Sequence, residues 1–399
     1  MNSPLALLRT ALGQEPFRLA HFVLVMGWSG LSLLLLRVGE VSLAWAGPGP
    51  SAAAQWLAAW SAGVATVVFV FLVCALVLQS LVRVLALGHA PYTRWSSVAA
   101  SPSSSPSQLA LERRSIPGLS ASAALAVGMV LLASVWLQWG QPTASAVLWC
   151  MGAGLELLIS VVVFYRLFKA SLKNELNDNF WPTITPALLI PAVGNALVVL
   201  AGIPLGFGTW SAVQFVLGCG LWPLVWGLLM LRQARVGALP IAMLPTWCIL
   251  LSPPSVVGLG LLAWQQSTLA THEPSMGWGI GAWTCWVLAG GNLWQIKPHA
   301  RAVLSAPFAM AHWALSFPFA AYASLTWALF ASVFTMISGG GTGSGSPLMT
   351  VLAWCLGLWA ATLVGVVLGI LSVLSVKTLQ LVLRSLVALS ESPAAHPEL

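Results

Sequence analysis

Charged side chains are scarce in this chain, so the few that interrupt apolar runs are the first candidates for chemistry. Glu156 is the acidic residue that lies deepest in such a run (LWCMGAGLELLIS). An ionised carboxylate is costly in an apolar environment, and intramembrane carboxyl groups often mark proton or ion pathways. Glu156 is therefore a candidate for proton coupling. A structural carboxyl group, or one at a contact between protomers, is the simpler alternative.

The histidines and cysteines do not suggest a metal, haem or enzyme site. His21 and His312 are solitary in their apolar runs, where a histidine usually forms a packing hydrogen bond, and the alternative is that they line an inner vestibule. No HExxH, GxSxG or nucleotide-binding loop occurs. The six cysteines lack the close spacing of metal ligands: they are Cys74, Cys150, Cys219, Cys248, Cys285 and Cys355. We expect no catalytic residue, no metal and no cofactor.

The composition places these residues in lipid. Of the 399 residues, 59% are hydrophobic and only 6% are charged, whereas soluble domains carry about 25% charged residues. The net charge of +7 comes from single or paired basic residues between apolar runs. A nucleic-acid-binding protein would concentrate them in one patch, so we expect no nucleic acid partner.

Ten apolar runs are long enough to cross the hydrocarbon core, which needs about 20 residues. The alternating pattern of a membrane β-barrel is absent. The sequence therefore predicts an all-α integral membrane protein. Its ten predicted transmembrane helices span about 19–38, 55–82, 118–138, 144–168, 186–204, 209–231, 241–264, 277–296, 306–336 and 348–374.

The basic residues support this count. With a cytoplasmic N-terminus, Arg37 is the one lysine or arginine of the sixteen that falls on the outer side. The positive-inside rule gives such a bias only when the spans are counted correctly. We therefore expect both termini in the cytoplasm, with an N-terminal segment (1–18), a transmembrane domain (19–385) and a C-terminal tail (386–399). A Ser/Pro-rich cytoplasmic loop (about 84–116) connects the second and third spans.

The outer connections are short or uncharged, so the spans pair as five helical hairpins closed on the outside. The odd-numbered spans carry glycines and prolines near mid-membrane. Proline breaks helical hydrogen bonding, and a membrane tolerates such breaks where a cavity or neighbouring helices supply partners. Glycine alone more often marks close packing. The recurrence in alternate spans favours a central pore lined at Gly27, Gly30, Gly128, Pro191, Gly194, Pro253 and Pro318.

Several segments resemble the tellurite-resistance/dicarboxylate transporter family, which includes bacterial tellurite-resistance protein A and the plant slow-type anion channels. PALLIPAVGNALVVLAGIPLG (186–206) is similar to the fifth helix of that family. ILLSPPSVVGLGLLAW (249–264) resembles the seventh and HWALSFPFAAYASLTWAL (312–329) the ninth, while FVLVMGWSGLSLLLL (22–36) is weakly similar to the first. The chain departs from the family in having Ser115-Ile116-Pro117 where His-Pro is common.

The resemblance implies five inner and five outer helices, a pore within each protomer, and a homotrimer. It also implies that a phenylalanine on the ninth helix plugs the pore, which matches Phe317. Core packing is the alternative role for this ring. Asn195, within the family-like motif of the fifth helix, is a further pore-lining candidate.

The leading hypothesis is a channel for small anions in a bacterial inner membrane, gated by Phe317. Arg37 would attract anions to the outer mouth, or it would be an ordinary interfacial arginine. The alternative function is a proton-coupled carrier or exporter of C4-dicarboxylates, sulfite or oxyanions such as tellurite. The expected partners are therefore small inorganic or dicarboxylate anions and the lipid bilayer.

Overall fold

The computed structural model of the chain describes residues 18–45, 47–88, 115–172, 180–269, 276–339 and 347–391. Within these ranges the regular structure is entirely helical. The predicted N-terminal segment (1–18), cytoplasmic loop (84–116) and C-terminal tail (386–399) lie wholly or mostly outside them. The account below concerns the described residues.

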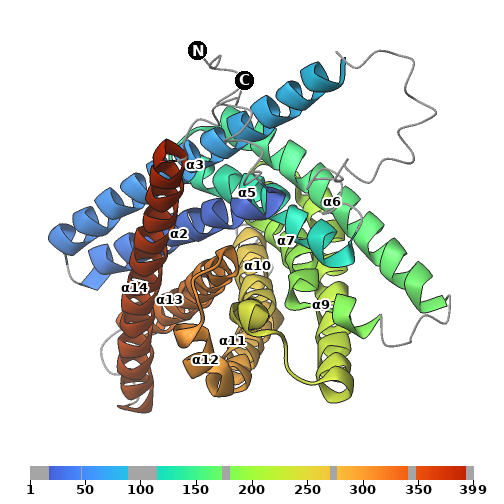
Figure 1. The fold of residues 1–399 in the computed structure, drawn as a ribbon. Coiled ribbons are helices and arrows are strands. Elements are labelled where there is room, and N and C mark those ends of the chain that lie inside the picture. The colour runs from blue at the N-terminus through green and yellow to red at the C-terminus, as the bar shows by residue number, and fades with distance from the viewer. Residues whose placement is uncertain are drawn as a thin grey trace, which may run out of the picture.

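The described helices form five packed pairs, each made of two segments that follow one another along the chain (Figure 1). The pairs are α2 (Val23–Trp45) with α3 (Pro48–Gly88), α5 (Ile116–Gln138) with α6 (Pro142–Leu172), α7 (Leu189–Leu197) and α8 (Val199–Gly202) with α9 (Gly208–Val236), α10 (Ser252–Leu269) with α11 (Met276–Ile296), and α13 (Ser316–Gly339) with α14 (Pro347–Glu391).

Eight of the described helices are long and apolar enough to cross a bilayer. The two other predicted spans correspond to the shorter apolar segment Pro186–Gly202 and to α11, which has 21 residues. The architecture is that of an all-helical, multi-pass membrane protein. The exact count of ten spans and the cytoplasmic position of both termini stay predictions.

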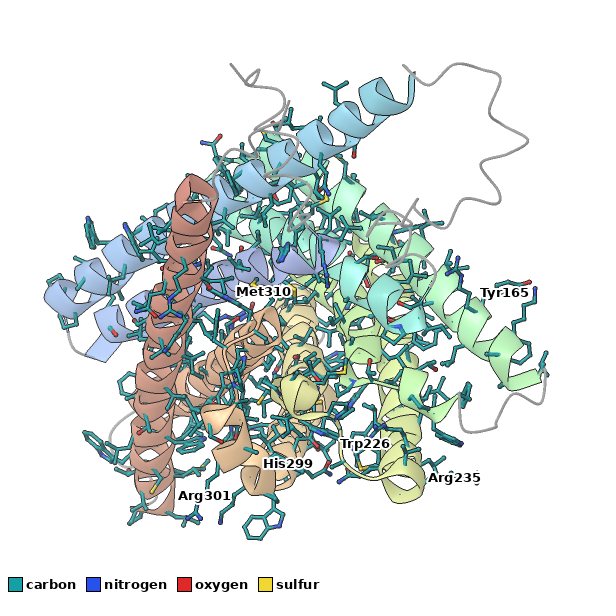
Figure 2. All side chains as sticks on the ribbon, viewed as in Figure 1. Tyr165, Trp226, Arg235, His299, Arg301 and Met310 are labelled. Carbon is teal, nitrogen blue, oxygen red and sulfur yellow. The ribbon has the colours of Figure 1, made fainter. Side chains whose placement is uncertain are left out.

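Burial separates the pairs into inner and outer members. In the spans of α2, α5, α10 and α13, 56–78% of the most apolar window is buried, against 22–39% for α3, α6, α9 and α14. The inner helices contact one another in a closed ring, in the order α2, α5, α7, α10, α13 and back to α2. The outer helices expose large apolar side chains, and Figure 2 shows Tyr165 projecting outward from α6.

Four inner spans begin as 3-10 helices and continue as α-helices. These 3-10 segments are η1 (Leu19–Phe22), η5 (Pro186–Leu188), η6 (Ile241–Leu251) and η8 (Met310–Leu315). Two of them are capped by a histidine: the N–H of Arg18 donates to Nδ1 of His21 at 2.9 Å, and that of Ala309 donates to Nδ1 of His312 at 3.1 Å. Both histidines are therefore hydrogen-bonded structural residues.

Two prolines of the inner spans lie where the helix type changes. Pro253 and Pro318 lie in the first turns of α10 and α13, where a helix needs no backbone N–H donor. At both points a serine side chain donates to the 3-10 segment: Ser252 Oγ to the Ile249 carbonyl at 3.0 Å, and Ser316 Oγ to the Trp313 carbonyl at 2.7 Å. The expected breaks at these prolines are therefore switches from 3-10 to α geometry.

The glycines of the first and third spans do not interrupt their helices. Helix α2 runs unbroken through Gly27 and Gly30, and α5 runs unbroken through Gly128. A Cβ atom at Gly128 would lie 3.4 Å from a side-chain carbon of Val25. Because these glycines allow the inner helices to approach closely, they serve packing without interrupting the hydrogen-bond ladder.

Two outer helices supply donors to carbonyl groups in the irregular inner spans. Trp149 of α6 donates through Nε1 to the carbonyl of Val198, the residue between α7 and α8, at 2.9 Å. Asn292 of α11 donates through Nδ2 to the Leu250 carbonyl in η6 at 2.7 Å. Lipid offers no such partners, so the outer helices make the broken inner spans tolerable.

Candidate functional site

The site centres on Phe317, the second residue of α13. Its ring is 5% exposed and contributes to the walls of two cavities on opposite sides of it. The ring packs against Gly30 of α2. Phe317 therefore lies between the two cavities, inside the ring of inner helices.

The outer cavity has a volume of about 480 Å³ and is bordered by all five inner spans. Close to Phe317 the wall is small or apolar, with Gly30, Leu131, Leu197 and Val256. Toward the far ends of the helices it becomes polar, and the polar lining residues are Arg37, Glu40, Ser134, Gln138, Gln266, Ser267 and Ser324. The cavity is thus a vestibule with a polar mouth and an apolar base.

The inner cavity is far smaller, at about 30 Å³, and its lining contains no charged residue. Its walls come from the stretches where 3-10 helices become α-helices: Val23, Met26, Ile190, Val193, Ile249, Ser252, Trp313, Ala314, Phe317 and Pro318. The smaller cavity therefore lies at the level where four inner spans change helix type.

The mouth of the vestibule carries a pair of opposite charges on one helix. Arg37 and Glu40 lie three residues apart on α2, and both border the outer cavity and an adjoining chamber of about 390 Å³. Arg37 is half-buried and Glu40 is exposed. The prediction from sequence considered Arg37 alone, although an i, i+3 spacing places Glu40 on the same face of a helix.

The predicted pore-lining residues divide into three groups. Gly30 and Pro318 border the cavities together with Phe317. Pro191 and Pro253 are neighbours in sequence of the lining residues Ile190 and Ser252, but they do not border either cavity themselves.

The other predicted lining residues lie at contacts between helices, which corrects their expected position. A Cβ atom at Gly27 would lie 2.9 Å from Cβ of Ser316, so this glycine lets α2 and α13 meet. Asn195 points to the outer helix α6, where its Nδ2 donates to Ser160 Oγ at 2.6 Å and to the Pro191 carbonyl at 2.8 Å. The rotation of each helix about its axis decides whether a residue faces the cavities or a neighbouring helix.

Glu156 packs against α7 but borders neither of the two cavities. It is fully buried on α6, and its carboxyl group occupies the space beside Gly194: a Cβ atom there would lie 2.7 Å from Oε2. Neither carboxylate oxygen has a hydrogen-bond partner among the described residues. Ile190 and Val193 of the same helix line the inner cavity, and residues four apart in a helix, such as Ile190 and Gly194, are neighbours. The carboxyl group and the inner cavity therefore both adjoin this one short helix.

A ring of membrane helices that encloses a vestibule and a narrow neck defines a transport protein of the channel or carrier class. The chain belongs to the voltage-dependent anion channel family, whose sequence profile matches residues 16–373. This is the family that the helix motifs resembled. Its members are channels or transporters and not enzymes.

Two curated relatives are described as uncharacterized transporters of Methanocaldococcus jannaschii. One is 28% identical over 205 residues, which is 46% of this chain and 53% of the relative. The other is 27% identical over 201 residues, which is 45% of this chain and 54% of the relative. The chain therefore spans about half the length of the curated relatives it matches.

Proposed function

We propose that the protein passes small anions across the membrane through the space enclosed by the inner helices, with Phe317 as the gate. The observation that carries this proposal is the position of the Phe317 ring between the vestibule and the inner cavity. Family membership supports anion transport in general. The gate itself is our inference from geometry.

The mechanism is steric and does not require a fixed binding charge at the neck. The ring closes the passage until it rotates away, and the walls of the inner cavity contain only apolar groups, a serine hydroxyl and backbone. Partial dipoles and pore size then select the ion. Arg37 raises the local concentration of anions at the mouth, while Gly30 and Pro318 shape the wall beside the ring.

The finer features of the predicted assembly belong to the same proposal. Ten spans with both termini in the cytoplasm follow from the distribution of basic residues. The resemblance of the helix motifs supports a homotrimer with one pore in each protomer. We place the protein in a bacterial inner membrane, with small inorganic or dicarboxylate anions as its cargo.

The test compares anion flux into liposomes for wild type, Phe317→Ala and Phe330→Ala. Phe330 is a buried ring on the same helix, 6% exposed, and it packs against Gly357 of α14, away from the cavities. We expect Phe317→Ala to raise basal flux at least tenfold and Phe330→Ala to leave it unchanged. Equal flux in wild type and Phe317→Ala, with both proteins folded, would refute the gate.

A second candidate function is a proton-coupled carrier, and the buried carboxyl group of Glu156 is the observation that favours it. Glu156 packs against Gly194 of α7, the helix that also contributes Ile190 and Val193 to the inner cavity, so a change in its protonation could shift the wall of that cavity. The measurement is flux with and without an imposed pH gradient in wild type and Glu156→Gln. Wild-type flux that does not change with the pH gradient would exclude this function. The substrates to compare are C4-dicarboxylates, sulfite and tellurite.

A further inference from the structure

A groove of about 550 Å³ lies between the ends of the outer helices α9 and α11. It is lined by Met230, Gln233, Ala234, Trp247, Trp294, Gln295, Pro298 and His299. Helices α9 and α11 are the outer partners of neighbouring inner spans, and they end at Val236 and Ile296. The groove therefore lies on the lipid-facing side of the molecule, where its helices reach the membrane surface.

The mouth of the groove carries donors and a positive charge. Lys297 holds its Nζ 4.9 Å from the ring centroid of Trp294, a residue that is 75% exposed. His299 stacks on Trp247 with the two ring centroids 6.1 Å apart. No acidic residue lines the groove. In Figure 2, His299 and Arg235 lie along the same lower edge of the molecule, with Trp226 between them.

Deeper along α9, the face that borders the groove continues as an apolar surface. Met230 and Trp226 lie one and two helical turns from Ala234 on this face, because residues four apart in a helix are neighbours. Trp226 lies beyond the groove and keeps 36% of its side chain exposed. A basic and aromatic groove that leads onto an apolar helix face matches the two ends of a phospholipid, and tryptophans favour this depth in a membrane.

We propose that this groove binds one anionic phospholipid, with the phosphate at Lys297 and His299 and an acyl chain along Met230 and Trp226. A hollow that opens between lipid-facing helices is filled by lipid, and basic pockets between membrane helices select acidic headgroups. A second copy of the chain that paired groove to groove would bring the same positive charge to the site, so it is a poorer occupant than a phospholipid. This binding does not depend on the proposed transport function.

The groove is connected to the neck of the passage through η6. Trp247 forms part of the groove, and two residues further along the same 3-10 segment Ile249 lines the inner cavity. The bound lipid therefore contacts the segment whose far side forms the wall beside Phe317.

The binding test uses native mass spectrometry of the purified protein with added phosphatidylglycerol or phosphatidylcholine. The variant Lys297→Gln/His299→Gln is compared with Arg301→Gln/Lys377→Gln, which removes two exposed charges from α12 (Ala300–Ser305) and α14, outside the groove. We expect the first variant to retain at least fivefold less phosphatidylglycerol than wild type, and the second to match wild type. Equal retention in both variants would overturn the site.

A steric variant tests the acyl part without a change of charge. Ala234→Trp fills the groove, whereas Leu231→Trp adds a similar ring at an exposed α9 position outside its lining. We expect Ala234→Trp alone to displace the lipid. Competition by glycerol phosphate as strong as that by phosphatidylglycerol would show a soluble-anion site and overturn the lipid assignment. Loss of an oligomer in Ala234→Trp would also overturn the lipid assignment, because it would show that a second copy of the chain occupies the groove.

Discussion

The ring of Phe317 packs directly on the backbone of Gly30: a Cβ atom added to this glycine would lie 3.2 Å from Cδ2 of the ring. The same Cβ atom would lie 3.2 Å from Cβ of Ala320. A separation of this size is tighter than ordinary van der Waals contact, so any side chain at position 30 must displace the ring or push α2 and α13 apart. Gly30 therefore determines where the proposed gate rests.

We expect Gly30→Ala to raise basal anion flux, and Gly30→Val to raise it further, because the added methyl groups push the ring from its resting place. Overpacking of this kind costs about 1–3 kcal/mol. Flux into liposomes measures the effect. The double variant Gly30→Ala/Phe317→Ala should conduct no more than Phe317→Ala alone, since the ring that Gly30 supports is gone. Additive increases would show that Gly30 acts elsewhere.

Arg37 and Glu40 should influence transport in opposite directions. Arg37→Gln removes the positive charge at the vestibule and lowers flux at low anion concentration, whereas Glu40→Gln removes a competing negative charge and raises it. A unit charge at close range in water contributes about 1 kcal/mol, so we expect changes of about fivefold at low ionic strength. Both effects should shrink in about 1 M salt, where screening acts within about 3 Å. Effects that persist in high salt would indicate a structural cause.

The contact between Glu156 and Gly194 predicts a specific pattern of stability. Gly194→Ala should destabilise the protein by about 1–3 kcal/mol, because its Cβ atom would overlap the carboxyl group. The double variant Gly194→Ala/Glu156→Ala removes the carboxyl group and should recover part of the lost stability. The double variant Gly194→Ala/Glu156→Gln keeps a side chain of the same volume and should not recover it. Thermal unfolding in detergent measures all four proteins. Equal stability of Gly194→Ala and wild type would contradict the packing.

The hydrogen bond from Trp149 to Val198 predicts a further effect on stability. Trp149→Phe keeps an aromatic ring to stack on Phe207, whose ring centroid lies 4.7 Å from that of Trp149, but it removes the donor to the carbonyl between α7 and α8. An unsatisfied buried carbonyl costs about 1–3 kcal/mol. Thermal unfolding should show that loss. Trp210→Phe, at an exposed α9 position, serves as the control and should leave stability unchanged.

The membrane class, the pairing of helices and the inner position of the odd spans could all be predicted from the sequence. The membrane class and the pairing depend on long apolar runs, short connections and the distribution of lysine and arginine. The inner position of the odd spans was predicted from their recurrent glycines and prolines and from the family resemblance. The position of Phe317 came from the resemblance of residues 312–329 to a family motif, and no periodicity would have singled it out.

Other features depend on contacts that a linear pattern does not contain. Gly128 and Gly194 both lie in inner helices, yet one faces α2 and the other the carboxyl group of Glu156, because rotation about the helix axis decides what each residue meets. Apolar periodicity also does not separate a 3-10 helix from an α-helix in a run that is apolar on every face. Glu40 was not predicted as a residue of the vestibule mouth, although its i, i+3 spacing from Arg37 places it on the same helix face.

The level at which the inner spans change helix type has a mechanical consequence. A 3-10 helix rises about 2.0 Å and turns about 120° per residue, whereas an α-helix rises about 1.5 Å and turns about 100°. If the junction at Ser316 moves by one residue, α13 advances by about 0.5 Å and turns by about 20° relative to its neighbours. Such a screw motion swings the Phe317 ring sideways relative to Gly30 of α2. Because four junctions border the same small cavity, coordinated shifts of this kind would widen or close it by rotating the helices.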